Sequence, residues 1–154
     1  MRTEKTNTIA LNAVLAALYI ALTLLSPFSF GTVNFRIADA VQVIACINKR
    51  TRVGISIGMA AANLFSPFGL VDVLAAVIIC VISFGVGWTI PSEIIRVWLL
   101  VLVSALVVGA ELCALEGLPF WMMFAGVFLS ETILCWAGYL AIKRIPSFYG
   151  RRRK

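Results

Sequence analysis

The sequence NFRIADAVQVIACINKRTRVGISIGMAAANLFSPFGLVD, residues 34–72, contains most of the polar residues that interrupt an otherwise apolar chain. It holds two short apolar segments, 36–47 and 53–64, separated by a basic hinge at 48–52. As helices, the two segments would each be roughly 18 Å long. The hydrocarbon core of a membrane is about 30 Å thick. We therefore expect both segments to tilt, to extend into flanking residues, or to reach only partway across.

The composition outside this stretch is that of a membrane protein. Of the 154 residues, 62% are hydrophobic and 13% are charged, whereas a soluble domain carries about a quarter charged residues. Several apolar runs approach or exceed the roughly 18 residues that a membrane helix needs. The sequence thus predicts an all-α integral membrane protein with one transmembrane domain over residues 1–154.

The chain offers few groups for chemistry of its own. It has no histidine and no Gly-x-x-x-x-Gly-Lys-Ser/Thr motif for ATP phosphates. Its cysteines lack metal-ligand spacing and are scattered, at Cys46, Cys80, Cys113 and Cys135. The net charge of +6 comes from basic blocks beside apolar runs, which is typical of membrane topology rather than of nucleic-acid binding. We expect no catalytic residues, no metal and no cofactor, so an intramembrane enzyme is disfavoured.

Breaks in the apolar pattern predict six transmembrane helices and a basic tail. Their ranges are 8–25, 36–47, 53–64, 70–88, 92–115 and 120–142, with the tail at 143–154. On this count twelve of the 13 basic residues lie on one face of the membrane, and Arg36 alone lies on the other. Because basic residues collect on the cytoplasmic side, both termini are predicted to be cytoplasmic. Four or five helices would scatter these residues over both faces.

A row of polar side chains begins the second predicted helix. Arg36, Asp39 and Gln42 lie at positions i, i+3 and i+6, so they face broadly one way. We interpret Asp39 and Gln42 as contacts for a polar ligand, with Arg36 orienting the site. The preceding Asn34 and Phe35 could add a hydrogen bond and a stacking surface. An ion pair at the start of a helix is the alternative.

A second pair of polar side chains, Asn63 and Asp72, brackets a short loop that Pro67 stiffens. This loop would hold both side chains at the depth of Asp39, on the outer side of the membrane. The alternative is a structural role, in which Asn63 caps the third helix and Asp72 occupies the favourable first turn of the fourth.

Two further carboxylates lie within the last two predicted helices. Glu111 lies about one turn, and Glu131 about three turns, below the outer end of its helix. A carboxylate at membrane depth is costly and usually faces inward for function. We predict that Glu111 and Glu131 close the site from the other end of the chain, with Trp121 as a candidate wall. The alternative is a proton-coupled carrier or an oligomeric channel that uses these carboxylates.

Helix 8–25 carries Ala13, Ala17 and Ala21 at a spacing of four. Such a stripe of small residues lets another helix approach closely. We interpret the stripe as a docking face for a partner subunit. Packing within the same protein is the alternative.

Three stretches together resemble the QueT family: ALYIALT at 17–23, NFRIADA at 34–40 and ANLFSPFGLVD at 62–72. Its members are substrate-binding S components of energy-coupling factor (ECF) transporters, associated with queuosine precursors. The resemblance implies an S-component-like bundle in the bacterial plasma membrane and a 7-deazaguanine ligand. It also implies docking on a transmembrane coupling subunit with two ATPase subunits. A carboxylate would accept two parallel hydrogen bonds from the ring edge, and Phe35 or Trp121 would stack on the ring.

Overall fold

The computed structural model describes residues 2–26 and 35–145, and every regular element within these ranges is helical. The predicted all-α class is therefore confirmed. Four helical stretches are long and apolar enough to cross a membrane: Lys5–Leu25, Leu70–Thr89, Glu93–Glu116 and Phe120–Lys143. Large apolar side chains are exposed along them, as expected for a surface that faces lipid.

Three helices have 24 residues each: α1 (Arg2–Leu25), α6 (Glu93–Glu116) and α7 (Phe120–Lys143). The ends of α6 follow from local sequence. The Ser92 hydroxyl accepts from the Ile95 N–H at its start, and Gly117 ends it with a left-handed φ of 69°, which glycine adopts without a steric cost. Residues 117–119 then turn the chain directly into α7, so α6 and α7 form an antiparallel hairpin.

The second predicted helix, 36–47, is not continuous. The structure has two single turns there, α2 (Asp39–Gln42) and α3 (Ile44–Ile47). Side chains from other helices bond the carbonyl groups around this break: Cys135 Sγ donates to the Asp39 oxygen at 3.8 Å, and Trp88 Nε1 donates to the Ala45 oxygen at 3.1 Å. Such tertiary bonds satisfy backbone groups that a continuous helix would pair internally.

The remaining elements lie close to the predicted ranges. A 3-10 turn, η1 (Lys49–Thr51), leads into α4 (Arg52–Asn63). After a short loop comes α5 (Leu70–Cys80), which continues through a π turn, η2 (Val81–Gly85), and a 3-10 turn, η3 (Val86–Thr89). With α2 and α3 counted as one interrupted segment, the described chain forms six helical segments, of which the second and third are short.

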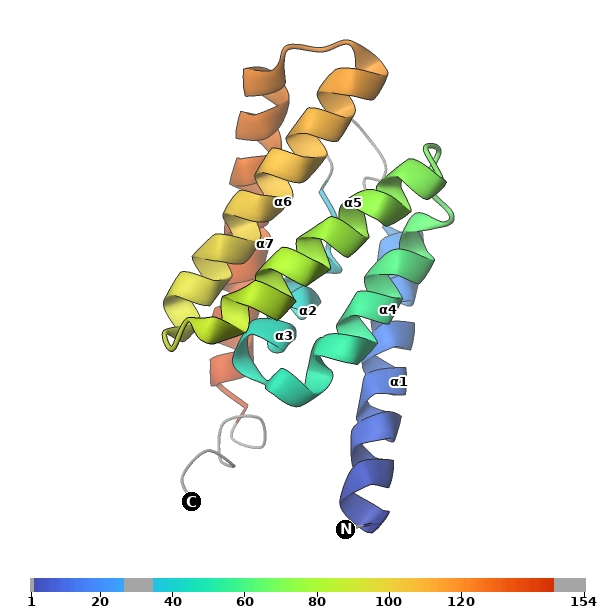
Figure 1. The fold of residues 1–154 in the computed structure, drawn as a ribbon, viewed down its shortest axis with the longest axis vertical. Helices are drawn as coiled ribbons and strands as arrows, with labels where there is room; N and C mark the ends of the chain where they lie inside the picture. Colours follow the sequence, from blue (N-terminus) through green and yellow to red (C-terminus); the bar gives the residue numbers. More distant parts are fainter. Residues whose placement is uncertain (1, 27–34, 146–154) are drawn as a thin grey trace.

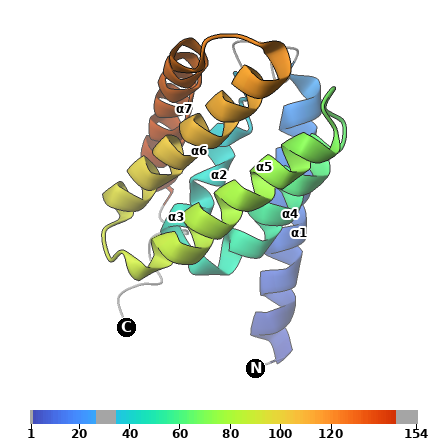
Figure 2. The same cartoon turned by 45° about the horizontal axis from the view of Figure 1, so that its top comes forward.

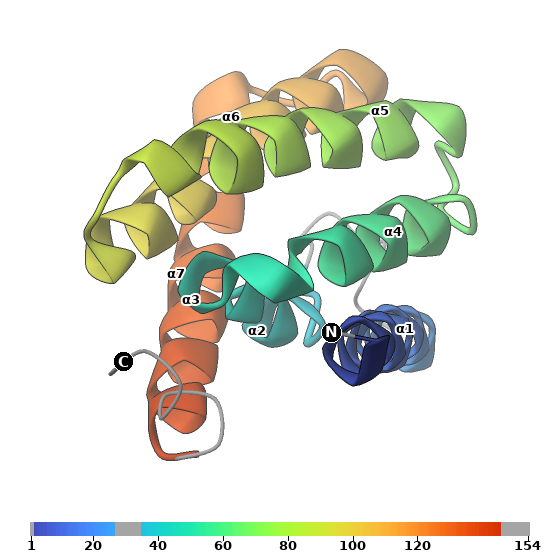
Figure 3. The ribbon, with the colours of Figure 1, turned by 60° about the horizontal axis from the view of Figure 1, so that its bottom comes forward.

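Successive helices run in opposite directions, so every second connection lies at the same end of the bundle. Figure 1 shows the start of α1, turn η1, the start of α6 and the end of α7 at the lower end of the molecule. Figure 2 shows the α4–α5 and α6–α7 connections together at the opposite end. Viewed from below, α2 and α3 lie inside the bundle, between α7 on one side and α1 and α4 on the other (Figure 3).

Glycines allow two of these contacts. A Cβ on Gly58 of α4 would lie 3.0 Å from the Cα of Ala16 on α1, and one on Gly54 would overlap the backbone of Asn12. On α7, a Cβ on Gly138 would overlap the backbone of Ala40 on α2. Small residues thus bring α4 against α1 and α2 against α7.

The lower half of the bundle interior is filled by apolar side chains. The buried residues there come from α3, α4 and α6 and include Ile44, Ala45, Cys46, Ile47, Ile55, Val97, Leu100 and Val101. Below them, the Arg96 guanidinium stacks 4.0 Å from the centre of the Trp88 ring. Arg52 Nη1 donates to the Phe84 carbonyl at 2.8 Å. The polar side chains described next lie above this apolar layer.

Candidate functional site

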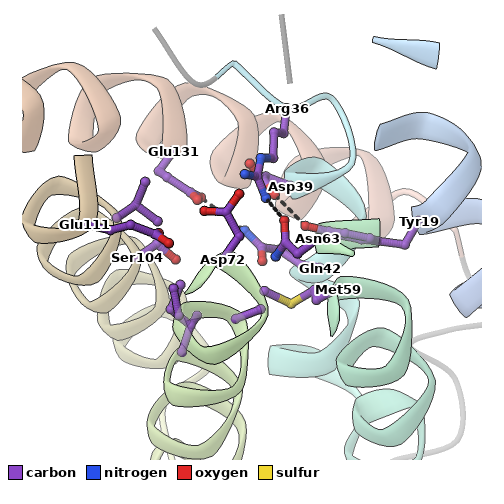
Figure 4. A pocket seen from close by; sticks show the side chains of 14 residues that line it. Tyr19, Arg36, Asp39, Gln42, Met59, Asn63, Asp72, Ser104, Glu111 and Glu131 are labelled. Atoms are coloured by element: carbon purple, nitrogen blue, oxygen red, sulfur yellow. Dashed lines mark hydrogen bonds between the residues drawn. The ribbon is translucent and has the colours of Figure 1, made fainter. Parts of the chain in front are cut away.

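Six helices contribute side chains to one cavity in the upper half of the bundle (Figure 4). The empty space at this site is about 360 Å³ with its open mouth included. The polar lining consists of Tyr19, Arg36, Asp39, Gln42, Asn63, Asp72, Ser104, Glu111 and Glu131. The apolar lining consists of Met59, Ala75, Ala76, Ile79 and Val108.

Gln42 and Glu131 form the innermost polar contact. Gln42 Nε2 donates to Glu131 Oε2 at 3.1 Å, and Cys135 Sγ, one turn further along α7, lies 3.2 Å from the same oxygen. Both Gln42 and Glu131 are buried, with exposed fractions of 1% and 7%. Gln42 Nε2 is engaged by Glu131, whereas the other amide atom of Gln42, Oε1, is buried and has no hydrogen-bond partner.

Asp39 is held from the other side by α1. The Tyr19 hydroxyl donates to Asp39 Oδ1 at 2.9 Å, and both side chains are buried. Figure 4 shows Tyr19 reaching across from α1 toward Asp39. This bond connects the first helix of the chain to the cavity.

Arg36 lies just before α2 at the edge of the cavity. Its Nη1 donates to Asn63 Oδ1 at 2.6 Å, which joins the end of α4 to the approach to α2. Figure 4 shows the guanidinium above Asp39 and near Asp72. Arg36 thus supplies the positive charge of the lining.

Asp72 and Glu111 face each other at the outer part of the cavity (Figure 4). Asp72, in the first turn of α5, accepts a hydrogen bond from the Ser66 hydroxyl, so the α4–α5 loop fixes its orientation. Glu111 Oε1 is buried and has no hydrogen-bond partner. The loop between Asn63 and Asp72, which was predicted to hold both side chains in place, therefore orients Asp72 through Ser66.

The electrostatic character of the lining is acidic. Four carboxyl groups from four helices face one guanidinium: Asp39 on α2, Asp72 on α5, Glu111 on α6 and Glu131 on α7. Carboxylates, an amide oxygen and hydroxyls are mainly hydrogen-bond acceptors. In the part of the chain that the structure describes, no group of three acidic, cysteine or histidine side chains is arranged to hold a metal ion. The cavity suits an organic ligand that is rich in donors.

Seven of the ten residues predicted for the site line this cavity: Arg36, Asp39, Gln42, Asn63, Asp72, Glu111 and Glu131. Asn34 lies outside the described residues. Phe35 is half-buried and does not line the cavity.

The expected aromatic wall at Trp121 is wrong. Its side chain is 74% exposed, and its ring packs on Phe120 and Phe124 of the same helix. The buried face of α7 runs through Met123 and Val127, and Trp121 lies about 200° around the helix from Met123. The apolar wall comes instead from α4, α5 and α6.

Two polar lining residues were missed in the sequence, Tyr19 and Ser104. Each carries a signal that could have found it. Tyr19 lies well inside an apolar helix rather than at its end, where interfacial tyrosines collect. Ser104 lies seven residues before Glu111 on α6, which places both on one face.

The alanine stripe of α1 faces outward. Ala13, Ala17 and Ala21 are all exposed, whereas Asn12 and Ala16 of the same helix meet the glycines of α4. The stripe therefore takes no part in the packing of α1 against α4.

Sequence comparison with known proteins gives the family of this chain. The family model described as "QueT transporter" matches residues 9–146. A curated relative, the queuosine precursor transporter QueT of Lactococcus lactis subsp. cremoris (strain MG1363), is 32% identical over 90 residues, which are 56% of this chain and 53% of the relative. The matched region thus spans about half the length of that relative. No solved structure matches the chain significantly. Because the family model covers almost the whole of the chain, this protein belongs to the QueT transporter family.

Proposed function

We propose that this protein is the substrate-binding S component of an ECF-type importer for a queuosine precursor. It binds a 7-deazaguanine, such as the aminomethyl form or queuine, from the extracellular side. The observation that carries the proposal is the convergence of four carboxyl groups, from four helices, on one cavity of a QueT-family chain. The name of the Lactococcus lactis relative points to the same class of ligand.

The ligand chemistry fits the lining. A 7-deazaguanine ring presents neighbouring N–H donors at its ring nitrogen and 2-amino group, and a carboxylate accepts two such parallel bonds. An aminomethyl substituent adds a cation that a second carboxylate would neutralise. The flat ring would lie against Met59, Ile79 and Val108, which supply apolar surface between the polar groups.

The distribution of basic residues supports the membrane orientation within this proposal. The elements at the lower end in Figure 1 carry Lys5, Lys49, Arg50, Arg52 and Lys143. Placing that lower end in the cytoplasm satisfies the positive-inside rule. The chain then crosses the plasma membrane six times with both termini inside, and the cavity lies in the outer half.

The packing below the cavity favours a binding protein over a channel that runs through the single chain. A conducting pore needs a path through the molecule, but the lower half of the described bundle is filled by buried apolar side chains. A binding subunit needs only the outer cavity. Uptake that depends on added coupling subunits would distinguish the two, since a channel conducts without an ATPase.

A thermal-shift panel on the purified protein tests the ligand. We expect 7-deazaguanines to raise the unfolding temperature, because a ligand at 100 times its Kd stabilises the folded state by about 2.7 kcal/mol. Guanine and cationic vitamins at equal concentration serve as comparisons. Stabilisation by a cationic vitamin and by no 7-deazaguanine would contradict the proposal.

Docking on the coupling subunit is expected to use the exposed stripe of α1. Replacing Ala17 with tryptophan should abolish copurification with a transmembrane coupling subunit and its two ATPases, because a bulky side chain prevents close helix approach. Ligand affinity should stay unchanged, since Ala17 points away from the cavity. The matched control is Ala137→Trp on α7, another exposed alanine, which should leave copurification intact. Normal copurification of A17W would exclude the stripe as the docking face.

A further inference from the structure

The cavity has two levels that differ in chemistry. By their positions along the helices, the lining residues Gln42, Ser104 and Glu131 form an inner level, and Asp72 and Glu111 form an outer level near the α4–α5 and α6–α7 connections. On α6, Ser104 lies seven residues deeper than Glu111, which is about 10 Å along the helix axis. A ligand that spans both levels would therefore meet different groups at its two ends.

The inner level offers a neutral polar atom that lacks a partner. Gln42 and Ser104 are each 1% exposed, and Gln42 Oε1 is buried without a hydrogen-bond partner. The Ser104 hydroxyl lies within reach of Glu131. Buried polar groups are almost always paired in folded proteins. Both side chains line the same cavity, so a ligand with neutral N–H donors would form hydrogen bonds to them.

The outer level holds two carboxyl groups. Asp72 and Glu111 face each other, and Glu111 Oε1 also lacks a partner. Two neighbouring carboxylates repel each other. A ligand cation placed between them would remove this repulsion and bond the open oxygen of Glu111.

Within the function proposed above, on which this inference rests, we propose that the two levels divide the ligand between them. The inner level binds the neutral donor edge of the ring through Glu131, with Gln42 and Ser104 beside it. The outer pair, Asp72 and Glu111, binds the ammonium group of the side arm. The cavity then selects amine-bearing 7-deazaguanines over neutral ones, and Asp72 and Glu111 determine that selectivity.

Calorimetry with two rings that differ only in the arm tests this division. The probes are 7-aminomethyl-7-deazaguanine, which is cationic, and 7-cyano-7-deazaguanine, which is neutral. The protein with Asp72 and Glu111 intact should bind the cationic ring at least about tenfold more tightly, as expected for a charge-assisted hydrogen bond. Asp72→Asn and Glu111→Gln should each reduce this ratio, mainly by weakening the cationic ring.

Two other variants separate the levels. Gln42→Leu should weaken both rings and keep the ratio, because its oxygen contacts the part that the rings share. Glu116→Gln removes an exposed carboxylate at the end of the same helix as Glu111 and should change neither affinity. Thermal unfolding without ligand verifies that each variant is folded.

The outcomes distinguish this inference from the proposed function. Equal affinity of the unmodified protein for the two rings would overturn the selectivity and leave the proposed function standing. A ratio that survives both D72N and E111Q would overturn the assignment of the outer pair. Failure of the unmodified protein to bind either ring, and queuine as well, would overturn the proposed function itself.

Discussion

Replacing Gly138 with alanine is expected to lower the unfolding temperature and to remove most of the ligand affinity. A Cβ at Gly138 would overlap the carbonyl oxygen, carbonyl carbon and Cα of Ala40. These are backbone atoms, so no side chain can rotate away, and α2 must move off α7. Overpacking of this kind costs about 1–3 kcal/mol. Since α2 carries Asp39 and Gln42, its displacement also disorganises the cavity.

The matched control is Gly126 on the same helix. A Cβ there meets nothing within 4 Å, so Gly126→Ala should leave ligand affinity unchanged. It should keep or raise the unfolding temperature, because alanine favours a helix interior by about 1 kcal/mol over glycine. Thermal unfolding and calorimetry on both variants provide the comparison. Normal stability and affinity in G138A would show that α2 and α7 do not approach as closely as the structure places them.

Much of the helical layout could be predicted because it depends on local pattern. Apolar runs and the proline and glycine breaks placed the long helices close to α5, α6 and α7. The break between α2 and α3 could not be predicted in this way. The tertiary hydrogen bonds to the backbone of this segment come from Cys135 and Trp88, which lie 43 or more residues away in sequence.

Site residues could be predicted where burying the side chain in a membrane helix carries a large energetic cost. A carboxylate inside an apolar helix is expensive, so Asp39, Asp72, Glu111 and Glu131 could be selected before their positions were known. A hydroxyl group costs less free energy to bury than a carboxylate, so Tyr19 and Ser104 are harder to recognise as site residues in the sequence. The prediction of Trp121 as a pocket wall was wrong because aromatic side chains occur both at membrane interfaces and in pockets. Only the rotation of α7 about its axis shows which of the two positions Trp121 occupies.

The helix-packing stripes show another limit of the sequence. Both α1 and α4 carry small residues at a spacing of four, Ala13/Ala17 on one and Gly54/Gly58 on the other. Spacing alone cannot show which stripe faces a neighbour inside the protein. The structure uses the glycines for α1–α4 packing and leaves the alanines exposed, which is why the docking proposal rests on α1.

Replacing Glu131 with glutamine, or Asp39 with asparagine, is expected to weaken 7-deazaguanine binding while the protein stays folded. Each amide keeps an oxygen that can accept the native bond, from Gln42 Nε2 to residue 131 and from the Tyr19 hydroxyl to residue 39. The negative charge is lost, and one acceptor oxygen is replaced by an N–H donor group. Hydrogen bonds to charged groups contribute about 1.5–3 kcal/mol, so calorimetry should record a loss of roughly 10- to 150-fold in affinity.

Ser130 provides the control for this loss of charge. It is buried next to Glu131, donates to the Val127 carbonyl of its own helix at 3.0 Å, and does not line the cavity. Ser130→Ala should therefore leave affinity unchanged although it alters a buried polar group one residue away. If both E131Q and D39N bind the ligand as tightly as the unmodified protein, these carboxylates do not contact the ligand and the cavity is not the binding site. If S130A loses as much affinity as E131Q, the effect comes from the packing of α7 rather than from charge.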